Sequence, residues 1–463
     1  MRVCLPFPEI AAWLLVSCSL TVATPGNADE APRFTLRSGE KYFRVDGQPG
    51  FVLGRNPVGI SPNAYDDHFR HAAAAGERLM RIHFTFSPPS EQAGQIDPAV
   101  LKGWDAVLDA AEKHDLAVLP VLGVWADWND GSHGEPWHRW DNNALNAARG
   151  GPARRPAELL DDGPCRTLWL QRLEQFVKRW SSRRAIVAWE IFSEVDLITG
   201  AREERAVDFA ERAAAVVRAA DPWKRPVTVS QSGVNEWPKL LKSRALDFIE
   251  IHPYTGGALG GRLDEVILST VRERLAKYGK AVLLGESGLD FRPPRHSLEV
   301  APRAELGIRN AIWASLVSGA MNGRMLWWQD GYDQFEKVDL CRHYQQIAAP
   351  AALFVRGVDF TDFAPIPCDL SAGLKGAVIG NARTRIAWFR DARCGPPDWP
   401  PRLLAGQQVT MDAIAGSWQV EFFDPLTGKS TGQSRVNVQD QRLRIPLAEF
   451  QGSIAVRLRQ LGP

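Results

Sequence analysis

Between residues 51 and 355, short apolar runs alternate with longer stretches of helical periodicity. Runs of consecutive apolar positions are typical of strands that are buried on both faces, as in a parallel sheet. In the intervening stretch 201–220, apolar side chains recur every three or four positions, which predicts an amphipathic helix. Eight strand–helix units in about 300 residues predict an α/β fold of the (β/α)8, or TIM barrel, type. The eight predicted strands are Phe51–Gly54, Leu79–Phe84, Leu116–Gly123, Ile186–Phe192, Val227–Ser230, Leu246–Ile251, Ala281–Gly285 and Arg324–Trp328.

After residue 355 the pattern changes to short runs in which apolar and polar positions alternate. Turn signals such as Asp424-Pro425 separate these runs, and helical periodicity stops. This pattern predicts that the barrel, residues 51–355, is followed by a small antiparallel β-sandwich over residues 356–463. Residues 29–50 form a lead to the barrel, with a predicted hairpin that turns at Asp46-Gly47.

Residues 1–28 are expected to be an export signal rather than part of the fold. Arg2 gives this segment a positive start, and the apolar run from Ile10 to Ala23 is too short to span a bilayer comfortably. We therefore expect a mature chain without a transmembrane span, exported to the bacterial periplasm or the extracellular space. The run Leu-Val-Ser-Cys that ends at Cys18 resembles a bacterial lipobox. Two alternatives stay open: an outer-membrane lipoprotein held through Cys18, or an ordinary cysteine within the signal.

The composition narrows the class of partner. Lys and Arg total 55 and Asp and Glu total 54, a balance that argues against a nucleic-acid partner. The 17 tryptophans offer flat apolar faces that suit stacking on sugar rings. Beyond the signal the cysteines are in no metal-binding spacing, so disulfides are the alternative, and Cys368 with Cys394 is the first pair to test. All pairings stay open among Cys165, Cys341, Cys368 and Cys394.

In a (β/α)8 barrel, side chains at the carboxyl ends of the strands face the active site. Two carboxylates, Glu194 and Glu286, follow predicted apolar strands, where a charge is costly unless it is used or paired. We expect substrate-binding roles for the other polar and aromatic side chains at these ends, namely Arg81, His83, Ser193, His252, Tyr254 and Trp328. The long loop over residues 124–163 adds the candidate sugar platforms Trp125, Trp128 and Trp137.

Paired carboxylates are what cleavage of a glycosidic bond requires, because one acts as a protonated acid while the other stays ionised. Apolar walls and a like charge raise the pKa of one carboxyl, and the donors Arg81, His252 and Tyr254 are suited to lowering the pKa of the other. We expect the two carboxyl groups to lie about 5–5.5 Å apart, the separation that leads to retention of configuration. This chemistry needs no metal ion and no organic cofactor.

The same residues carry a family resemblance. The run from Trp189 to Glu194 reads Trp-Glu-Ile-Phe-Ser-Glu and resembles the Trp-Glu-x-x-Asn-Glu signature of the clan A retaining glycoside hydrolases. The run from Leu283 to Gly288 is similar to the strand that carries the nucleophile in that clan. The resemblance implies a cellulase-like or β-mannanase-like barrel in which Glu194 is the acid/base and Glu286 is the nucleophile.

The resemblance also implies roles around the two glutamates. Arg81 would support the charge of the nucleophile, and Tyr254 would donate a hydrogen bond to it. His252 would orient the acid/base or a sugar hydroxyl, and Trp328 would form the floor of the subsite that holds the cleaved sugar. One position departs from the clan, because Ser193 stands where an asparagine amide binds the sugar 2-hydroxyl. Since hydrogen bonds at that hydroxyl contribute at the transition state, Ser193 affects the expected rate and sugar preference.

We therefore expect an exported retaining glycoside hydrolase that cleaves a β-linked glucan, mannan or exopolysaccharide. If the tryptophan-rich loop closes the pocket, the enzyme is instead an exo-acting β-glycosidase. Two other classes stay open. The first is a non-catalytic carbohydrate-binding barrel, and the second is a processing protein whose C-terminal module binds a polysaccharide or a cell-surface partner.

Overall fold

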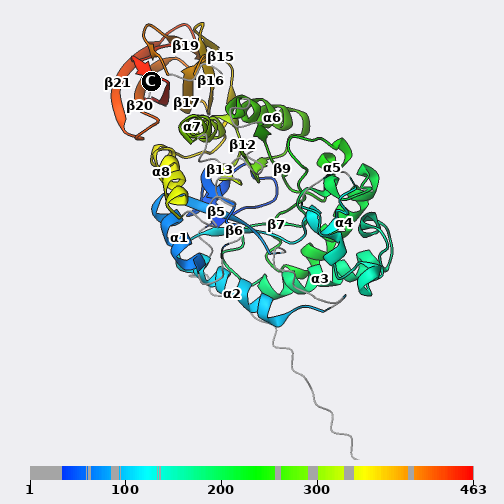
Figure 1. Cartoon of the computed structure of the whole chain (residues 1–463). Coiled ribbons are helices and arrows are strands. Elements are labelled where there is room, and N and C mark those ends of the chain that lie inside the picture. Colours follow the sequence, from blue (N-terminus) through cyan, green and yellow to red (C-terminus); the bar gives the residue numbers. More distant parts are fainter. Residues whose placement is uncertain are drawn as a thin grey trace, which may run out of the picture. The chain divides into compact units, whose positions relative to one another are not determined.

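Parallel strands form the centre of the N-terminal two thirds of the chain (Figure 1). The computed structural model describes residues 34–58, 60, 64–84, 93, 95–132, 134, 137–255, 262–289, 301–327, 338–394 and 401–461, all within the unit Pro32–Pro463. The expected export signal therefore lies outside the described residues. Six parallel strands pair in the order β13 (Asn322–Leu326), β4 (Val52–Arg55), β5 (Glu77–His83), β6 (Ala117–Val121), β7 (Trp189–Glu190) and β8 (Val227–Thr228).

A second parallel pair joins β9 (Ile249–Ile251) to β11 (Val282–Leu284). Backbone hydrogen bonds place this pair beside both ends of the larger sheet. On the β8 side, Asp247 N donates to Val227 O at 2.9 Å, and on the β13 side Met321 N donates to Val282 O at 2.9 Å. Each of the eight predicted strands overlaps one of these observed strands, so the strand positions predicted from the apolar runs are confirmed, although β5 and β13 each begin two residues before the predicted range.

Helices follow the strands and bury one face against them. In α4 the buried positions Ala206, Phe209, Ala210, Ala213 and Val217 recur at helical spacing, as the periodicity predicts. Local sequence also sets helix ends, because Asp97 Oδ1 accepts a hydrogen bond from Ala99 N at the start of α2. The helices are α1 (Tyr65–Ala74), α2 (Pro98–Lys113), α3 (Pro164–Trp180), α4 (Glu203–Ala220), α5 (Pro238–Lys242), α6 (Leu263–Tyr278), α7 (Ala301–Ser318) and α8 (Val338–Val355).

The long loop after β6 is folded into short 3-10 helices in its described part. These are η3 (Trp125–Trp128), η4 (Trp140–Asn142), η5 (Ala147–Arg149) and η6 (Pro156–Leu160). Trp128 and Trp140 are buried with their ring centroids 5.7 Å apart, and both belong to the hydrophobic cluster that contains Met80 and Ile82 of β5, so the loop packs against the core. The predicted N-terminal hairpin is also present. β2 (Phe43–Val45) and β3 (Gln48–Gly50) pair across Asp46 and Gly47, whose positive φ values of 50° and 81° suit a tight hairpin turn.

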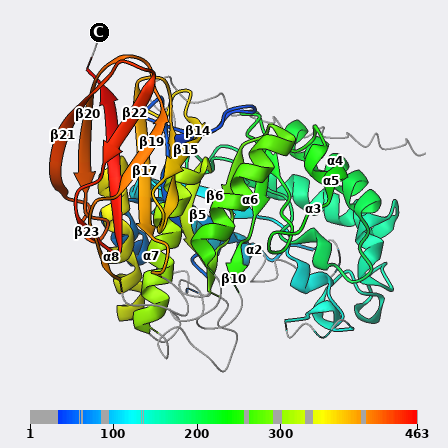
Figure 2. The same ribbon diagram turned by 90° about the horizontal axis from the view of Figure 1, so that it is seen from above.

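The C-terminal region consists of antiparallel sheets (Figure 2). One hydrophobic cluster contains Phe389 and Trp418 from the larger sheet and Met411 and Leu443 from the smaller one, so the two sheets share a core. The larger sheet runs β14 (Ala364–Ile366), β16 (Leu374–Gly380), β17 (Thr384–Asp391), β24 (Ser453–Gln460), β20 (Gly416–Phe423) and β21 (Ser430–Val438). The smaller sheet runs β15 (Cys368–Leu370), β19 (Gln408–Asp412) and β22 (Arg442–Pro446), and β18 (Leu403–Leu404) pairs with β23 (Phe450–Gln451).

The larger sheet packs against helices of the preceding domain. Ile386 and Trp388 of β17 belong to the same hydrophobic cluster as Ala314 of α7. The buried Arg390 Nε lies 2.5 Å from Asp264 Oδ2 on α6, which adds an ion pair across this contact. The C-terminal sheets therefore do not present two free faces.

The described cysteines form no disulfide. Cys165, Cys368 and Cys394 are free, so the pairing of Cys368 with Cys394 put forward from the sequence is wrong. The two cysteines are on different parts of the module, one on β15 and the other just after β17. The side chain of Cys341 lies outside the described residues. Of the helices that the structure describes, none combines the length and the apolar character needed to cross a membrane.

Candidate active site

The carboxyl ends of the parallel strands bring together the charged residues singled out from the sequence. Arg81 lies in β5, Glu194 follows β7, His252 follows β9 and Glu286 follows β11. Glu194, His252 and Glu286 each offer one side-chain atom within 4.8 Å of those of the other two. Because Glu194 and Glu286 are 92 positions apart in the numbering, this proximity is a product of the fold.

The Glu286 carboxylate is held by two donors. Arg81 Nη1 donates to Glu286 Oε1 at 2.7 Å, and the Tyr254 hydroxyl donates to Glu286 Oε2 at 2.6 Å. Burial alone would raise the pKa of Glu286, but the charges of His252 and Arg81 and the Tyr254 hydrogen bond lower it below its usual range. Glu286 is therefore set up to remain ionised, as a nucleophile must be.

The pKa of the Glu194 carboxyl is shifted upward, in the opposite direction to that of Glu286. Burial raises the Glu194 pKa, the hydrogen bond with His252 lowers it, and the charge of Glu286 raises it, with a net upward shift. His252 Nδ1 lies 2.8 Å from Glu194 Oε1. The Glu194 backbone is in the left-handed region, at φ 56°, and its N–H donates to Ser230 Oγ at 3.0 Å. A buried carboxyl with a raised pKa beside an ionised one is the arrangement of a general acid and its partner.

Arg81 is fully buried and connects most of the site. Its guanidinium donates to both oxygens of Glu190, at 2.6 and 2.8 Å, as well as to Glu286. Arg81 Nε also lies 2.9 Å from Glu250 Oε1. Burial opposes the charge of Arg81, but Glu190, Glu286 and Glu250 raise its pKa well above the usual value. A permanently charged Arg81 thus partly neutralises three buried carboxylates.

The two histidines differ in charge. Burial lowers the pKa of His83 well below its usual value, and the charge of Arg81 lowers it further. A neutral His83 can accept the hydrogen bond that Arg81 Nη1 offers to its Nε2 at 3.0 Å. Burial would also lower the pKa of His252, but the charge of Glu286, the hydrogen bond with Glu194 and the nearby Glu250 carboxyl raise it to about 10. His252 is therefore the charged histidine of the site.

Ser193, Trp125 and Trp137 differ in burial and in the residues that they contact. Ser193 is buried, and its Oγ accepts a hydrogen bond from Arg81 Nη2 at 2.9 Å. Trp125 is partly buried, and its backbone N donates to Ser193 O at 3.2 Å. Trp137 packs with Tyr254 in a small cluster that also contains Val58 and Trp327. These contacts place the backbone of Trp125 next to Ser193 and the Trp137 side chain next to Tyr254.

The other two predicted aromatic contacts are Trp128, which is buried, and Trp328, which the structure does not describe. Trp128 is only 2% exposed and packs against Trp140, so it stabilises the loop and offers no open face to a sugar. The prediction that Trp128 binds substrate is therefore corrected. Trp328 lies outside the described residues. Its neighbour Trp327 has its ring centroid 5.0 Å from that of His83, which brings this tryptophan next to the site.

Three buried polar residues of the site were missed from the sequence. Glu190 and Glu250 both pair with Arg81, and the Ser230 hydroxyl donates to Glu190 Oε1 at 2.9 Å. The sequence does contain a signal for Glu250, because this charged residue stands between Ile249 and Ile251 in a short apolar strand. A charge in the middle of a buried strand requires a partner, and the partner here comes from another strand.

Among the described residues, two groups of ligand-type atoms are close enough together to hold a metal ion. They are Glu190, Glu250 and His252, and Glu194, His252 and Glu286. Arg81 already lies against the carboxylates of both groups, and its fixed positive charge disfavours a cation there. The residues suit proton transfer and nucleophilic attack better than metal binding.

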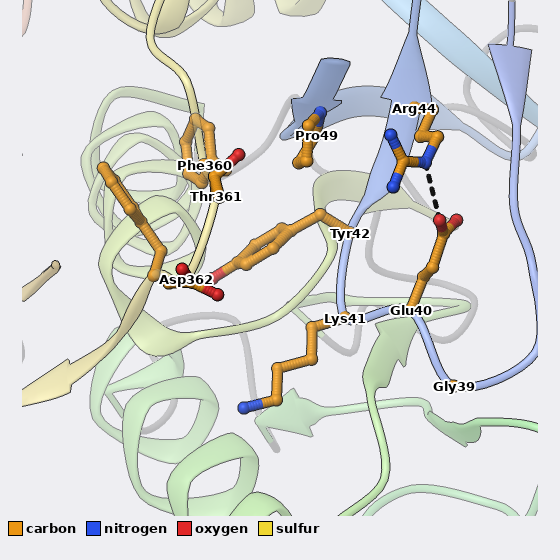
Figure 3. A pocket seen from close by; sticks show the side chains of 10 residues that line it. Gly39, Glu40, Lys41, Tyr42, Arg44, Pro49, Phe360, Thr361 and Asp362 are labelled. Carbon is orange, nitrogen blue, oxygen red and sulfur yellow. Dashed lines mark hydrogen bonds and ion pairs between the residues drawn. The ribbon is translucent and has the colours of Figure 1, made fainter. Parts of the chain in front are cut away.

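A cavity of about 320 Å³ lies elsewhere, between the N-terminal hairpin and the segment that precedes β14 (Figure 3). Tyr42, Phe360 and Phe363 line it, and Glu40 pairs with Arg44 at its edge at 2.6 Å. The three aromatic rings are buried, and none of the charged strand-end residues contributes to the lining. This cavity is therefore separate from the candidate active site.

Comparison with known proteins gives similarity in structure but not in sequence. No family model matches the chain, and no curated protein sequence matches it. A solved glycoside hydrolase superposes with a TM-score of 0.58 at 11% identity, covering 93% of this chain and 97% of its own. A glycoside hydrolase of family 5 from Bacteroides vulgatus ATCC 8482 has a TM-score of 0.58 at 10% identity, covering 92% and 93%. The endo-1,4-β-mannanase from Rhizomucor miehei has a TM-score of 0.50 at 13% identity, covering 69% and 99%.

At such low identity, the likeness establishes a shared fold. The structural neighbours include family 5 glycoside hydrolases, which belong to clan A, and their fold implies a TIM barrel. The resemblance to clan A noted in the sequence is thus confirmed at the level of structure.

Proposed function

We propose that this chain is an exported, retaining glycoside hydrolase that cleaves β-linked polysaccharides or oligosaccharides by double displacement. The observation that carries the proposal is the pair Glu194 and Glu286, whose side-chain atoms approach within 4.8 Å and whose pKa values are shifted in opposite directions. One oxygen of Glu194 within 4.8 Å of one oxygen of Glu286 supports the short carboxyl separation of retaining enzymes, roughly 5–5.5 Å, over the roughly 6.5–9.5 Å of inverting ones.

In the first step, Glu286 attacks the anomeric carbon and forms an ester bond to the sugar. The bond from that carbon to the leaving oxygen breaks, and Glu194 gives its proton to this oxygen. In the second step Glu194 takes a proton from water, whose oxygen attacks the anomeric carbon and displaces the Glu286 carboxylate. Two inversions restore the original configuration. His252, 2.8 Å from Glu194, would orient the acid/base during both steps.

The proposed scaffold is one closed (β/α)8 barrel over residues 51–355, followed by a β-sandwich over residues 356–463. The hydrogen bonds that join β8 to the segment before β9, and β11 to the segment before β13, support closure of the ring of strands. We also propose export through residues 1–28, with lipidation of Cys18 as the alternative to simple secretion. Any polysaccharide or cell-surface partner of the C-terminal module would have to bind a face that the barrel helices leave open.

For the substrate, we propose a β-linked glucan, mannan or exopolysaccharide cut internally, with exo-action as the alternative. One structural neighbour is an endo-1,4-β-mannanase, which makes mannan a natural first substrate to test. The partly buried Trp125 and Trp137 are the proposed sugar contacts of the long loop. Ser193 is held by Arg81, so the 2-hydroxyl contact of the clan asparagine would pass to another group or to water.

Digestion of a panel of polysaccharides tests the proposed function. The panel contains β-mannan, β-1,4-glucan, β-1,3-glucan and aryl β-glycosides, and the products are separated by size. Release of a ladder of oligosaccharides from one polymer supports internal cleavage, and release of single sugars supports exo-action. Binding to a polymer without any release would overturn the enzyme and favour the carbohydrate-binding barrel.

The pKa shifts predict a bell-shaped dependence of kcat/KM on pH. Activity is lost as the pH falls through the lowered pKa of Glu286, because the nucleophile must be ionised. Activity is lost again as the pH rises through the raised pKa of Glu194, because the acid must carry a proton. Initial rates over a wide pH range check this expectation. A profile that keeps rising above neutral pH would contradict the role of Glu194 as the acid.

A further inference from the structure

Glu250 lies in the middle of β9, and the proposed mechanism gives it no step. Its side chain is fully buried, with Oε1 2.9 Å from Arg81 Nε and 3.6 Å from His252 Nε2. The neighbouring strand makes room for it, because a Cβ on Gly285 would lie 1.9 Å from Glu250 Oε1. Position 285, directly before Glu286, must therefore be a glycine, because any side chain there would collide with the Glu250 carboxylate.

The imidazole of His252 connects Glu250 to the acid/base. Its Nε2 faces Glu250, while its Nδ1 lies 2.8 Å from Glu194 Oε1 and 3.7 Å from Glu286 Oε2. A ring with a carboxylate at each nitrogen is favoured with a proton on both nitrogens, which is the charged form. The two ring nitrogens of His252 therefore face Glu194, which takes part in the proposed reaction, and Glu250, which does not.

We propose that Glu250 is a positioning residue that holds His252 in its charged form and thereby sets the alkaline limit of the acid/base Glu194. This inference rests on the proposed function for the roles of Glu194 and Glu286. The state of His252 itself can be measured without any turnover, so the two ideas can fail separately.

The surrounding charges are consistent with this role. Burial and the charge of Glu190 raise the pKa of Glu250, Arg81 and His252 oppose the rise, and the net pKa is about 7. Glu250 thus ionises near neutral pH, where its charge begins to stabilise the His252 cation. The other charged groups that face His252 are Glu194, Glu286 and Arg81, and Arg81 also contacts the neutral His83, with its Nη1 3.0 Å from His83 Nε2.

The Glu250→Gln substitution removes this charge and keeps the shape of the side chain. We expect His252 to lose its proton at a lower pH than in the unaltered protein, so that between the two His252 pKa values Glu194 lacks its nearest positive neighbour. Over that pH interval Glu194 keeps its proton more readily, and activity on the alkaline side extends upward in Glu250→Gln. The acid limb stays in place, because Glu250 is already protonated at that pH in the unaltered protein. A purely structural defect would lower the rate without moving one limb alone.

The closing experiment is an NMR titration of histidine in full-length protein labelled with 15N-histidine, with the His252 signal assigned by its absence in His252→Asn. In the unaltered protein we expect a charged His252 up to about pH 10, with a small inflection near pH 7 as Glu250 ionises. In Glu250→Gln we expect the His252 pKa to fall by about one unit or more. The matched control is Glu77→Gln, which removes a fully buried carboxylate paired with Arg55 at 2.6 Å.

An unchanged His252 titration in Glu250→Gln would overturn the proposal, as would an equal change in Glu77→Gln. If Glu250→Gln does not fold, the inflection near pH 7 in the unaltered protein decides, and its absence counts against Glu250. Failure to hydrolyse any glycoside in the panel would remove the proposed function, whereas the titration would still establish or refute the coupling of Glu250 to His252.

Discussion

The Glu286→Ala variant is expected to lose activity by a factor on the order of 10⁴ to 10⁶ in kcat, since no other group can form the bond to the anomeric carbon. The fold should persist, because Arg81 keeps its ion pairs with Glu190 and Glu250 when the Glu286 carboxylate is removed. Rates on the substrate found in the panel, together with circular dichroism spectra, measure both effects. The exposed Glu273, on α6, provides the control Glu273→Ala, which should retain full activity.

Comparison with Glu194→Ala separates the two roles. An aryl glycoside with a good leaving group needs little help from an acid, so the first step should be much less impaired in Glu194→Ala than in Glu286→Ala. Equal losses on activated and unactivated substrates would argue against Glu194 as the proton donor. Activity of Glu286→Ala near that of the unaltered protein would argue against the whole assignment.

The Arg81→Met variant is expected to have the second largest effect, on both stability and activity. Arg81 faces Glu190, Glu250 and Glu286, and its removal leaves these buried carboxylates without their cation. Breaking a buried pair in this way typically costs about 3–5 kcal/mol of unfolding free energy. The pKa of Glu286 should rise as well, which lowers the fraction of ionised nucleophile near neutral pH.

The loss of stability in Arg81→Met should depend on pH. In the unaltered protein the lowered pKa of Glu286 contributes stability above its unfolded-state pKa, and this contribution is lost as the pH falls through the folded-state pKa. In Arg81→Met the carboxylates gain stability by taking up protons, so the deficit relative to the unaltered protein should shrink at acidic pH. Denaturation midpoints at several pH values check this. A deficit that is constant with pH would mean that Arg81 acts through packing alone.

The strand positions and the two glutamates could be predicted because both signals are local. A strand buried on both faces must be apolar at successive positions, and a carboxylate directly after such a strand is conspicuous. The contacts of Arg81 and Tyr254 with Glu286 followed the roles implied by the clan resemblance. The proximity of Glu194 and Glu286 followed from the topology of parallel strands alone.

The remaining features depend on distant pairings that no local pattern specifies. Glu250 has an identifiable signal, but its pairing with Arg81 depends on how β5 and β9 are placed in the fold, and β5 is far from β9 in the sequence. Whether a tryptophan in a long loop faces a sugar or another side chain depends on how the loop folds back. Trp128 packs on Trp140, and the sequence spacing of these two rings does not distinguish that outcome from an open platform.

Labelling with an activated 2-deoxy-2-fluoro glycoside tests the central pair most directly. The fluorine slows the second step, so the sugar accumulates on the nucleophile, and digestion followed by mass spectrometry locates it. Gluco and manno reagents both apply, according to the sugar that the panel selects. We predict one added sugar per chain, on the peptide that contains Glu286, and no label in Glu286→Ala. A label on a different side chain, or complete failure of inactivation in an enzyme that hydrolyses the parent glycoside, would contradict the double-displacement account.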